Sequence, residues 1–513
     1  MNTKNNLHTG NYLLYFISFF EGGCVMAAEL LGAKLMAPFF GTSLHVWASV
    51  LASTLIALAL GYFIGGILSK KANRLNTILL IALFGGIFIM LMPYSIKFAL
   101  GLIGSLSITL SIIVSAVALL IPPLFMMGTI SPLIIAELSE KNNNAGYVSG
   151  SIYAISTLGG ILFTFLYGFY IIPTFGLKFP ALYTGASFSL IPVIIFVLKR
   201  KYNYVAIWLA VIIASGYLSH KKHTVIGIEI KYQQEGMLGR VTVADYIPLD
   251  SNSIENGRVL MINNVVQGYE NKGKGNSYLF EYHHIFIDII EKNYPKGACV
   301  SALGLGTGTI PNILYKKNYC VEVCDIDERI HTVAKDYFNF DPNIKVCIDD
   351  ARHYINNLER NFDVIVIDIF KGEESAPHLI TLESFLEMKK HLNTDGVIMF
   401  NINGYIDGSI GKGNRSLLKT LNQAGFNFKV LPQGYNDTIP DQRNLFIIAA
   451  TNTNKLDSIM KPYNNQLIPN SSIDLQNAVV FTDDIPQAEV LFAEASKRWR
   501  EIYFTSSVIL FGN

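Results

Sequence analysis

The first 220 residues contain apolar runs that are too long to serve as core helices of a soluble domain. Between residues 75 and 136 the only charged side chain is Lys97, and between residues 142 and 198 it is Lys178. A helix needs about 20 apolar residues to cross a hydrocarbon core of about 30 Å. These runs therefore predict transmembrane helices. About seven candidate spans lie near residues 12–37, 46–68, 75–96, 105–135, 147–172, 180–198 and 204–219.

Basic residues favour one orientation of these helices. They fall in alternate loops, at Lys70, Lys71 and Arg74, at Lys141, and at Lys199, Arg200 and Lys201. The positive-inside rule places such loops, and with them the N-terminus, in the cytoplasm. Seven crossings would put the C-terminal half outside, whereas its cysteines lack disulfide-scaffold spacing and indicate a reduced compartment. We expect a multi-pass protein of the cell (inner) membrane with a cytoplasmic C-terminal half. This requires either an eighth crossing between residues 97 and 140 or an interfacial position for residues 204–219.

The composition changes at residues 220–223, where the sequence HKKH ends the apolar region. We predict a polytopic membrane domain over residues 1–220, with seven or eight spans, a small β subdomain over 221–285 and a Rossmann-like domain over 286–513. The polar stretch DSNSIENG at 250–257 predicts a hairpin loop in the β subdomain. A net charge of +1 gives the chain no field that would attract nucleic acid. The partners expected are therefore the lipid bilayer and a small molecule.

The C-terminal half alternates short apolar runs with helical segments. The runs are nearly free of charge, as expected for strands buried on both faces: ACVSAL, CVEVCDI, IKVCI, FDVIVIDIF and GVIMFNI. Between them, ERIHTVAKDYF and TLESFLEMKKHL show helical periodicity. This alternation predicts an α/β fold with a doubly wound, methyltransferase-type Rossmann-like sheet. In front of it, TVIGIEIKY, GRVTVADYI and RVLMINNVV predict the antiparallel strands of the β subdomain.

A glycine-rich turn follows the first of the buried strands. Gly304, Gly306 and Gly308 precede a helix, at a place where missing Cβ atoms let a ligand approach the backbone and the helix N-terminus offers N–H groups. The dinucleotide fingerprint needs glycine or alanine at position 309, which is Thr309 in this chain. The GxGxG spacing therefore favours a nucleoside sulfonium co-substrate over NAD or FAD.

Acidic residues follow three successive strands. Asp325 ends the second strand about 20 residues after the glycine turn, where a carboxylate can accept both ribose hydroxyl protons. Asp350 follows the third strand and is placed to accept from an adenine amino group. Asp368 follows the fourth strand and reaches the crevice in which such sheets bind ligands. For each acid taken singly, a helix N-cap or a solvated turn is the alternative.

These motifs together resemble the spermidine synthase-like aminopropyltransferases, in particular their membrane-fused branch. In the soluble half the resemblance rests on GRVTVADY, NNVVQGYE, EYHHIF, GLGTGTIP, DDARHYI, DIFKGEESAPHLITLESF and TDDIPQAEVL. In the membrane half it rests on AAELLGAKLMAPFFGTSLHVWASV, LIPPLFMMGTISPLI and GSIYAISTLGGILFTFLYGFYIIPTFG. The resemblance implies a transferase that moves an aminopropyl group from decarboxylated S-adenosylmethionine to a polyamine, without a metal. It is compatible with a homodimer.

The resemblance also implies roles for the loop and the three acids. The three glycines would carry the amino-acid or aminopropyl end of the co-substrate, while Asp325 would hold its ribose and Asp350 its adenine. Asp368 would be the general base for the attacking amine. An alkylamine with a pKa near 10.4 is neutral in only about one molecule per thousand at pH about 7.4, so attack on carbon requires such a group.

Three further residues match the family, and two positions depart from it. By resemblance, Gln267 would bind the co-substrate, and Tyr282 and His283 would flank the reacting groups; a polar hairpin end and a half-buried helix face are the alternatives. The family has an acid in the glycine loop where this chain has Thr307, and a second acid three residues after the base where it has Lys371. Each change removes an attraction for a cation. The donor therefore stays open between the decarboxylated and the intact form, with a methyltransferase as the alternative enzyme.

A third interpretation makes the membrane half a carrier or sensor of polyamines and the soluble half a non-catalytic nucleoside-binding domain. Glu21 and Glu29 stand in an apolar span. Intramembrane carboxylates are costly and usually face a cavity or a partner. A structural ion pair with Lys34 is the alternative to a ligand site.

Overall fold

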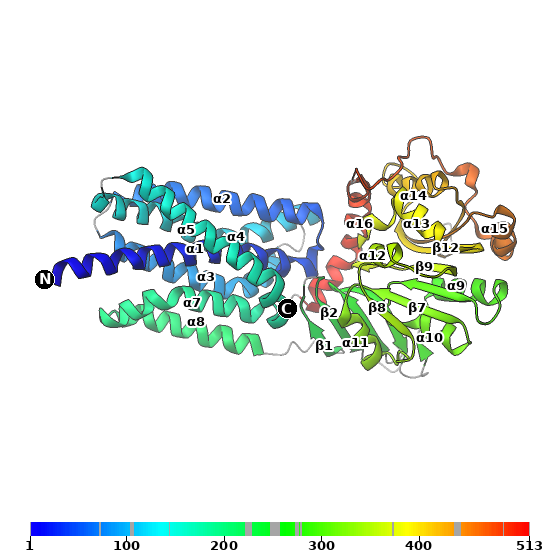
Figure 1. Ribbon diagram of the computed structural model, residues 1–513. Helices are drawn as coiled ribbons and strands as arrows, with labels where there is room; N and C mark the ends of the chain where they lie inside the picture. Colours follow the sequence, from blue (N-terminus) through cyan, green and yellow to red (C-terminus); the bar gives the residue numbers. More distant parts are fainter. Residues whose placement is uncertain are drawn as a thin grey trace. The chain divides into compact units, whose positions relative to one another are not determined.

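The computed structural model describes residues 2–70, 73–102, 107–142, 144–220, 228–236, 238–246, 257–271, 276–277, 280–371, 374–434, 443–485 and 487–511. The chain forms two compact units (Figure 1). The helical unit consists of Met1–His223 with Gln234–Gly239 and Ser506–Asn513, and the α/β unit consists of Thr224–Gln233 and Arg240–Thr505. Most of the HKKH segment and of the hairpin loop predicted at 250–257 lies outside the described residues.

Wherever the structure describes them, the apolar segments predicted as spans are almost wholly helical. The helices are α1 (Asn2–Phe40), α2 (Leu44–Leu68), α3 (Arg74–Leu102), α4 (Ile108–Asn142), α5 (Ala145–Leu166), the π-helical turn η1 (Tyr167–Ile171), α6 (Ile172–Phe175), α7 (Lys178–Leu198) and α8 (Tyr202–His220). Within the described residues, six helical stretches are long and apolar enough to cross a membrane: Asn11–Phe40, Leu44–Leu68, Arg74–Ile96, Ile108–Glu140, Ala145–Phe175 and Lys178–Leu198. The apolar stretch of α8, Tyr202–Leu218, is shorter.

Helix α4 bears on the first of the two topological alternatives, an eighth crossing between residues 97 and 140. It runs from Ile108 to Asn142 as one helix although it contains Pro122, Pro123 and Pro132. Membrane helices tolerate proline because neighbouring helices and hydroxyl side chains satisfy the freed backbone groups. The described part of residues 97–140 therefore holds no additional crossing, since α3 ends at Leu102 and α4 supplies a single long helix.

Small residues let the helices approach closely. A Cβ on Gly61 of α2 would lie 2.7 Å from the carbonyl oxygen of Phe125 in α4, and one on Gly65 would lie 2.7 Å from that of Thr129. Close backbone packing at small residues is typical of membrane helices, because lipid leaves little hydrophobic driving force for their association. Helix α1 packs against α2, α3, α4, α5 and α7 (Figure 1). It is therefore the central helix of the bundle.

The α/β unit begins with a small five-stranded sheet in the order β1-β2-β3-β4-β5. Its strands are β1 (Ile228–Gln234), β2 (Val241–Tyr246), β3 (Gly257–Ile262), β4 (Val265–Asn271) and β5 (Asn276–Ser277). The segment RVLMINNVV, which predicts one strand, is in fact a β-hairpin. Asn263 and Asn264 form its turn with φ of 49° and 62°. Asparagine tolerates positive φ, and two such residues make the turn that matches the twist of paired strands.

A seven-stranded sheet forms the centre of the α/β unit, in the order β13-β14-β12-β9-β6-β7-β8. The strands are β6 (Cys299–Leu303), β7 (Cys320–Asp325), β8 (Lys345–Ile348), β9 (Phe362–Ile367), β12 (Leu392–Gly404), β13 (Asn427–Pro432) and β14 (Arg443–Ala450). The five predicted strands are the parallel ones, whereas β14 is antiparallel to both β12 and β13. A two-stranded ribbon, β10 (Phe370–Lys371) and β11 (Glu374–Ser375), lies apart from this sheet. The predicted fold class, a helical membrane-type region joined to a methyltransferase-type α/β fold, is confirmed.

Helices cover both faces of the central sheet (Figure 1). Alternate strand residues face two separate cores: Val300 and Ala302 lie in one, and Leu303 lies in the other. The first core includes residues of α9 (Glu281–Asn293), α10 (Thr309–Lys316), α11 (Glu328–Tyr337) and α15 (Thr453–Met460). The second includes residues of α12 (Ala351–Asn356), α13 (Leu382–Lys390), α14 (Lys412–Gln423) and the first turn of α16 (Gln487–Phe511). Burial on both faces leaves the loops at the carboxyl ends of the parallel strands as the place for a ligand.

Candidate active site

The glycine turn after β6 adopts a backbone that excludes side chains at two of its three glycines. All three have positive φ: 96° at Gly304, 54° at Gly306 and 75° at Gly308. A Cβ on Gly304 would lie 2.2 Å from the backbone oxygen of Asp368, and one on Gly308 would lie 2.3 Å from the ring of Phe340. At Gly306 no atom of the other described residues, apart from the two flanking ones, lies within 4 Å of that position. Gly306 therefore faces open space, which a ligand needs in order to approach the backbone at this position.

Asp325 stands at the end of β7 and braces this turn. One carboxylate oxygen accepts the N–H of Leu305 at 2.9 Å and the other accepts the N–H of Asp327 at 2.9 Å. Burial raises the pKa of Asp325 to about 6, and the two backbone hydrogen bonds oppose this shift. Each carboxylate oxygen keeps a further lone pair for an incoming hydroxyl group.

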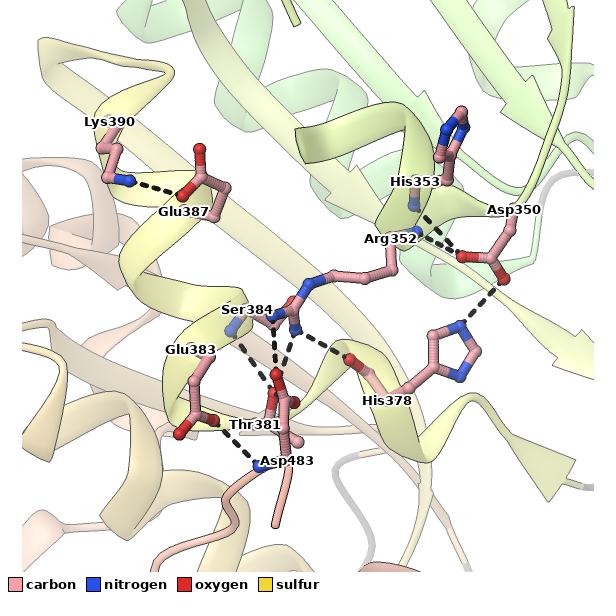
Figure 2. Close-up of polar contacts among 10 residues, drawn as sticks. All are labelled: Asp350, Arg352, His353, His378, Thr381, Glu383, Ser384, Glu387, Lys390 and Asp483. Atoms are coloured by element: carbon pink, nitrogen blue, oxygen red, sulfur yellow. Dashed lines mark hydrogen bonds and ion pairs between the residues drawn. The ribbon is translucent and has the colours of Figure 1, made fainter. Parts of the chain in front are cut away.

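Asp350 is held by more partners than the sequence predicts. As N-cap of α12, its Oδ1 accepts the N–H groups of Arg352 and His353 at 2.8 and 3.2 Å. Its Oδ2 lies 3.0 Å from Nε2 of His378, which belongs to a short 3-10 helix, Pro377–Leu379 (Figure 2). The N-cap alternative therefore describes Asp350 in this structure, and an adenine amino group would have to share Oδ2 with His378.

Asp368 follows β9 and is the centre of a three-residue hydrogen-bonded group. The hydroxyl of Tyr282 on α9 donates to its Oδ2 at 2.7 Å, and the side-chain amide of Asn401 on β12 donates to its Oδ1 at 2.9 Å. Burial raises the pKa of Asp368, while these two hydrogen bonds oppose the shift. Burial and the adjacent carboxylate raise the pKa of Tyr282 well above its ordinary value, so Tyr282 remains a donor. The structure thus holds a carboxylate oriented by two neutral donors.

Asn401 is a site residue that the sequence prediction missed. It lies in the apolar run GVIMFNI and therefore reads as part of a buried strand. Its Nδ2 binds Asp368, whereas its Oδ1 is buried and has no hydrogen-bond partner in the described part of the chain. A buried acceptor without a partner is costly unless a ligand or water satisfies it. This orphaned oxygen lies on the same amide that contacts Asp368, so it fits an N–H donor arriving at that carboxylate.

Gln267 and Thr307 lie where the small sheet meets the glycine turn. Gln267 lies on β4, next to Gly268. A Cβ on Gly268 would lie 2.3 Å from Cγ2 of Thr307, so β4 packs directly on the turn. The amide nitrogen of Gln267 donates to the carbonyl groups of Val265 and Val266, at 3.3 and 3.4 Å. Thr307 is buried, and its hydroxyl lies 2.8 Å from that of Thr309.

His283 has a structural role in α9. It is buried, and its Nδ1 accepts the backbone N–H of Phe280 at 3.2 Å, which caps the start of the helix. Burial, together with the neighbouring His284, lowers the pKa of His283 to about 3, so the ring is neutral. The helix-face alternative describes His283 better than a direct ligand contact, whereas its neighbour Tyr282 does contact Asp368.

A polar cluster ties the C-terminal TDDIP segment to the loops around Asp350 (Figure 2). The guanidinium of Arg352 donates to the carbonyl of His378 at 3.1 Å, to the hydroxyl of Thr381 at 3.1 Å and to the carboxylate of Asp483 at 2.9 Å. Thr381, the N-cap of α13, in turn donates to Asp483 at 2.7 Å. Arg352 therefore holds the segment with His378 and Thr381, which follows Asp368 in the sequence, so that His378 lies beside Asp350.

Comparison with known proteins agrees with this geometry. Residues 280–405, which carry the glycine turn, all three acids, Tyr282 and Asn401, match the spermine/spermidine synthase domain. This part of the chain is similar to spermine/spermidine synthase domains. The polyamine aminopropyltransferase of Vibrio vulnificus is 34% identical over 115 residues, or 21% of this chain and 38% of that protein. Polyamine aminopropyltransferase 1 of Aquifex aeolicus is 31% identical over 157 residues, or 29% and 53%.

The α/β unit is also similar to other proteins. An N-terminal histidine N-methyltransferase of Emericella nidulans is 31% identical over 115 residues, which are 21% of each chain. A solved structure of a probable spermidine synthase from Corynebacterium glutamicum covers 51% of this chain and 98% of its own, at 18% identity and a TM-score of 0.39. The chain thus spans about half or less of the length of these curated relatives, and the six apolar helices lie outside the matched domain.

Proposed function

We propose that the protein is a membrane-bound aminopropyltransferase that moves an aminopropyl group from decarboxylated S-adenosylmethionine to a polyamine. The observation that carries the proposal is the group formed by Tyr282, Asp368 and Asn401 beside the glycine turn. Gly304 brings the turn onto the backbone of Asp368, so the base and the loop that would hold the donor are one structural unit.

Asp368 acts on the proton of the amine nucleophile, whose removal or orientation limits the reaction. The carboxylate takes a proton from the ammonium or orients the N–H of the amine, while the lone pair of that nitrogen attacks the donor carbon. The new N–C bond forms as the C–S bond breaks, and the sulfur leaves as a neutral thioether. Tyr282 and Asn401 keep the carboxylate in one orientation, and Oδ1 of Asn401 accepts a second N–H of the amine. Because the sulfonium is already a good leaving group, positioning supplies most of the remaining catalysis.

The donor fits the residues at the ends of β6 and β7. Gly306 leaves room for it against the backbone, and the oxygens of Asp325 have acceptor capacity for the two ribose hydroxyls. Asp350 offers an acceptor to the adenine amino group when His378 shares or releases Oδ2. The described residues contain no cluster of three or more metal-ligating side chains, and the proposed reaction uses none.

A methyltransferase is the second candidate, and Thr307 is the observation that favours it. The amine of a decarboxylated donor is a cation that gains from an acid in the glycine loop, but the side chain here is a buried threonine engaged with Thr309. Intact S-adenosylmethionine carries its own carboxylate and needs no such acid. The match to a histidine methyltransferase of Emericella nidulans is consistent with this alternative.

The helix lengths support a cytoplasmic location for the α/β unit. Six crossings return the chain to the side of the N-terminus, and the shorter α8 is suited to the membrane interface. The basic loops then favour a cytoplasmic position for both ends of the membrane region, in a cell (inner) membrane. Reporter fusions placed after residue 200 and after residue 220 would test this topology: both are expected to report a cytoplasmic position, whereas a crossing by α8 would place the second one outside.

Calorimetric titration of the detergent-purified chain with the decarboxylated and the intact donor tests the function. We expect tighter binding of the decarboxylated form, loss of binding in Asp325→Ala, and retained binding without transfer in Asp368→Asn. Preference for the intact donor would replace the proposal by the methyltransferase. Binding of neither donor would refute both enzymes.

A further inference from the structure

Two pairs of cysteines lie side by side on neighbouring parallel strands of the central sheet. Cys299, the first residue of β6, is in register with Cys320, the first residue of β7. Cys324 of β7 is in register with Cys347 of β8. Neighbouring strands are about 4.8 Å apart, and disulfides join Cα atoms that are about 4.4–6.8 Å apart. All four thiols are free, and the strand register brings each pair within disulfide range.

The first pair points to one face of the sheet. Val300 and Val321, which follow Cys299 and Cys320, lie in the first core, whereas Cys299 packs against the second. Side chains alternate between the two faces along a strand, so Cys320 lies on the same side as Cys299. The pair stands at the amino ends of β6 and β7, while the glycine turn and Asp325 lie at their carboxyl ends. It is therefore not part of the candidate active site.

A guanidinium group lies beside the first pair. Arg360, in the loop between α12 and β9, donates through Nη2 to Sγ of Cys299 and also forms a side-chain hydrogen bond with Cys320. Its Nη1 binds the carboxylate of Glu322 at 3.2 Å, which holds the guanidinium next to the thiols. A neighbouring cation favours the thiolate, which is the reactive form of cysteine. The surroundings of this pair therefore promote thiol chemistry.

The second pair has acidic neighbours instead. Cys324 is buried, and its thiol donates to the backbone carbonyl of Asp349 at 3.3 Å. Burial raises the pKa of Cys324, and the adjacent Cys347 and the carboxylates of Asp325, Asp349 and Asp350 raise it further. A buried thiol of this kind is inert. The chain thus contains an internal control, which has the same strand register and the opposite electrostatic surroundings.

We propose that Cys299 and Cys320 form a dithiol site that hydrogen peroxide oxidises to a disulfide. Cys320 reacts first, as a thiolate beside Arg360: its sulfur attacks one peroxide oxygen, the O–O bond breaks, and hydroxide leaves and takes up the proton that the thiol had released. The thiol of Cys299 then attacks the sulfur of this sulfenic acid. The S–S bond forms, and the sulfenic oxygen leaves with the proton of Cys299 as water. Two thiols and one peroxide give one disulfide and two waters.

Cys299 suits the second role in this sequence. Burial and the adjacent Cys320 raise the pKa of Cys299 to about 12, so it stays a thiol until Cys320 has reacted. Both side chains are partly exposed, as access by peroxide requires. A soft metal ion is the other ligand that a thiol pair takes, but Arg360 would repel it, and no third metal-ligating side chain completes a cluster within the described residues. In a reduced compartment such a disulfide is transient.

Peroxide treatment of the full-length, detergent-purified protein tests the site. The reduced protein is exposed to hydrogen peroxide, its remaining thiols are alkylated, and its tryptic peptides are identified by mass. Residues 297–316 and 318–329 form separate tryptic peptides, each with one member of the pair, and we expect them to be joined with the loss of two hydrogens. Cys324 shares the second peptide, so the linkage is assigned in a Cys324→Ser background. Cys347 should remain alkylated.

Substitutions around the pair test the role of the guanidinium. In Arg360→Ala the rate of disulfide formation should fall about tenfold, because an adjacent cation shifts the ionisation of a thiol by about one pKa unit or more. Arg360→Lys should keep part of the rate. Lys345→Ala is the matched control, because it removes the other cation bound to Glu322, at 3.0 Å, and should leave the rate unchanged. In Cys299→Ser, dimedone should trap the sulfenic acid of Cys320.

The proposal is overturned by full alkylation of Cys299 and Cys320 after peroxide treatment. A Cys324–Cys347 disulfide that forms as fast would also overturn it, because strand register alone would then decide the reaction. An unchanged rate in a folded Arg360→Ala variant would have the same meaning. The comparison of the two pairs uses the wild-type surroundings of the first pair, so it decides the question even if the arginine variant does not fold.

Discussion

Replacing Tyr282 by phenylalanine should move the pH dependence of catalysis. The change removes one hydroxyl, which donates to Oδ2 of Asp368 at 2.7 Å and favours the ionised carboxylate. A hydrogen bond to a charged group is worth about 1.5–3 kcal/mol. Because 1.36 kcal/mol corresponds to one pH unit, the acid limb of the kcat/KM profile should move upward by about 1–2 units. The sign follows from the base being active when ionised: losing a donor makes the carboxylate harder to ionise.

The assay is transfer to a polyamine over a range of pH, for the wild type and two tyrosine variants. The matched control is Tyr294→Phe, which also removes a hydroxyl donor, at 2.9 Å from the carbonyl of Asp395 and away from Asp368. Its acid limb should coincide with that of the wild type. An unchanged limb in Tyr282→Phe, or a displacement to lower pH, would show that Asp368 is not the base or that Tyr282 does not stabilise its charge.

Three further outcomes are expected. The pKa of Asp325 is raised to about 6. Donor affinity measured by calorimetry should therefore fall about fivefold as the pH is lowered through 6, since an ionised acceptor binds hydroxyl groups better by about 1 kcal/mol. The Asp325→Asn variant should lose this pH dependence. Gly304→Ala should lower the free energy of unfolding by about 2–4 kcal/mol, because the new Cβ meets the Asp368 backbone. Gly306→Ala places its Cβ in open space, so it should lower the free energy of unfolding by only about 1 kcal/mol and chiefly weaken donor binding. Arg352→Ala should destabilise the α/β unit in thermal unfolding by about 1–3 kcal/mol, and Arg352→Lys by less, because Asp483 and Thr381 lose their partner.

The parallel strands could be predicted because burial on both faces leaves almost continuous apolar runs. The antiparallel direction of β14 could not, since RNLFIIAA has the same apolar character as the parallel strands of the sheet. The hairpin at Asn263 and Asn264 was hidden for a related reason: the apolar pattern continues on both sides of the turn. Only the consecutive asparagines, both at positive φ, distinguish it from one long strand.

The acids of the site could be found from their positions at strand ends, but their partners could not. Tyr282 and Asp368 are 86 residues apart in sequence, and their hydrogen bond depends on how α9 packs beside β9. Asn401 lies within a buried strand and has no local signal. For Asp350 the sequence predicts both an N-cap and a ligand contact, and only the structure shows that His378 is already present at the second oxygen.

The contact between Gly268 and Thr307 determines how this half of the protein can be recombined. The small sheet and the glycine turn meet there without space for a side chain at position 268. A chimera that took β3 and β4 from a relative with any larger residue at that point would push the turn away from Asp368. In a chimera, the hairpin β3–β4 and the glycine turn should therefore come from the same parent. The junctions between parents then lie before β3 or after α10, and not between the hairpin and the turn.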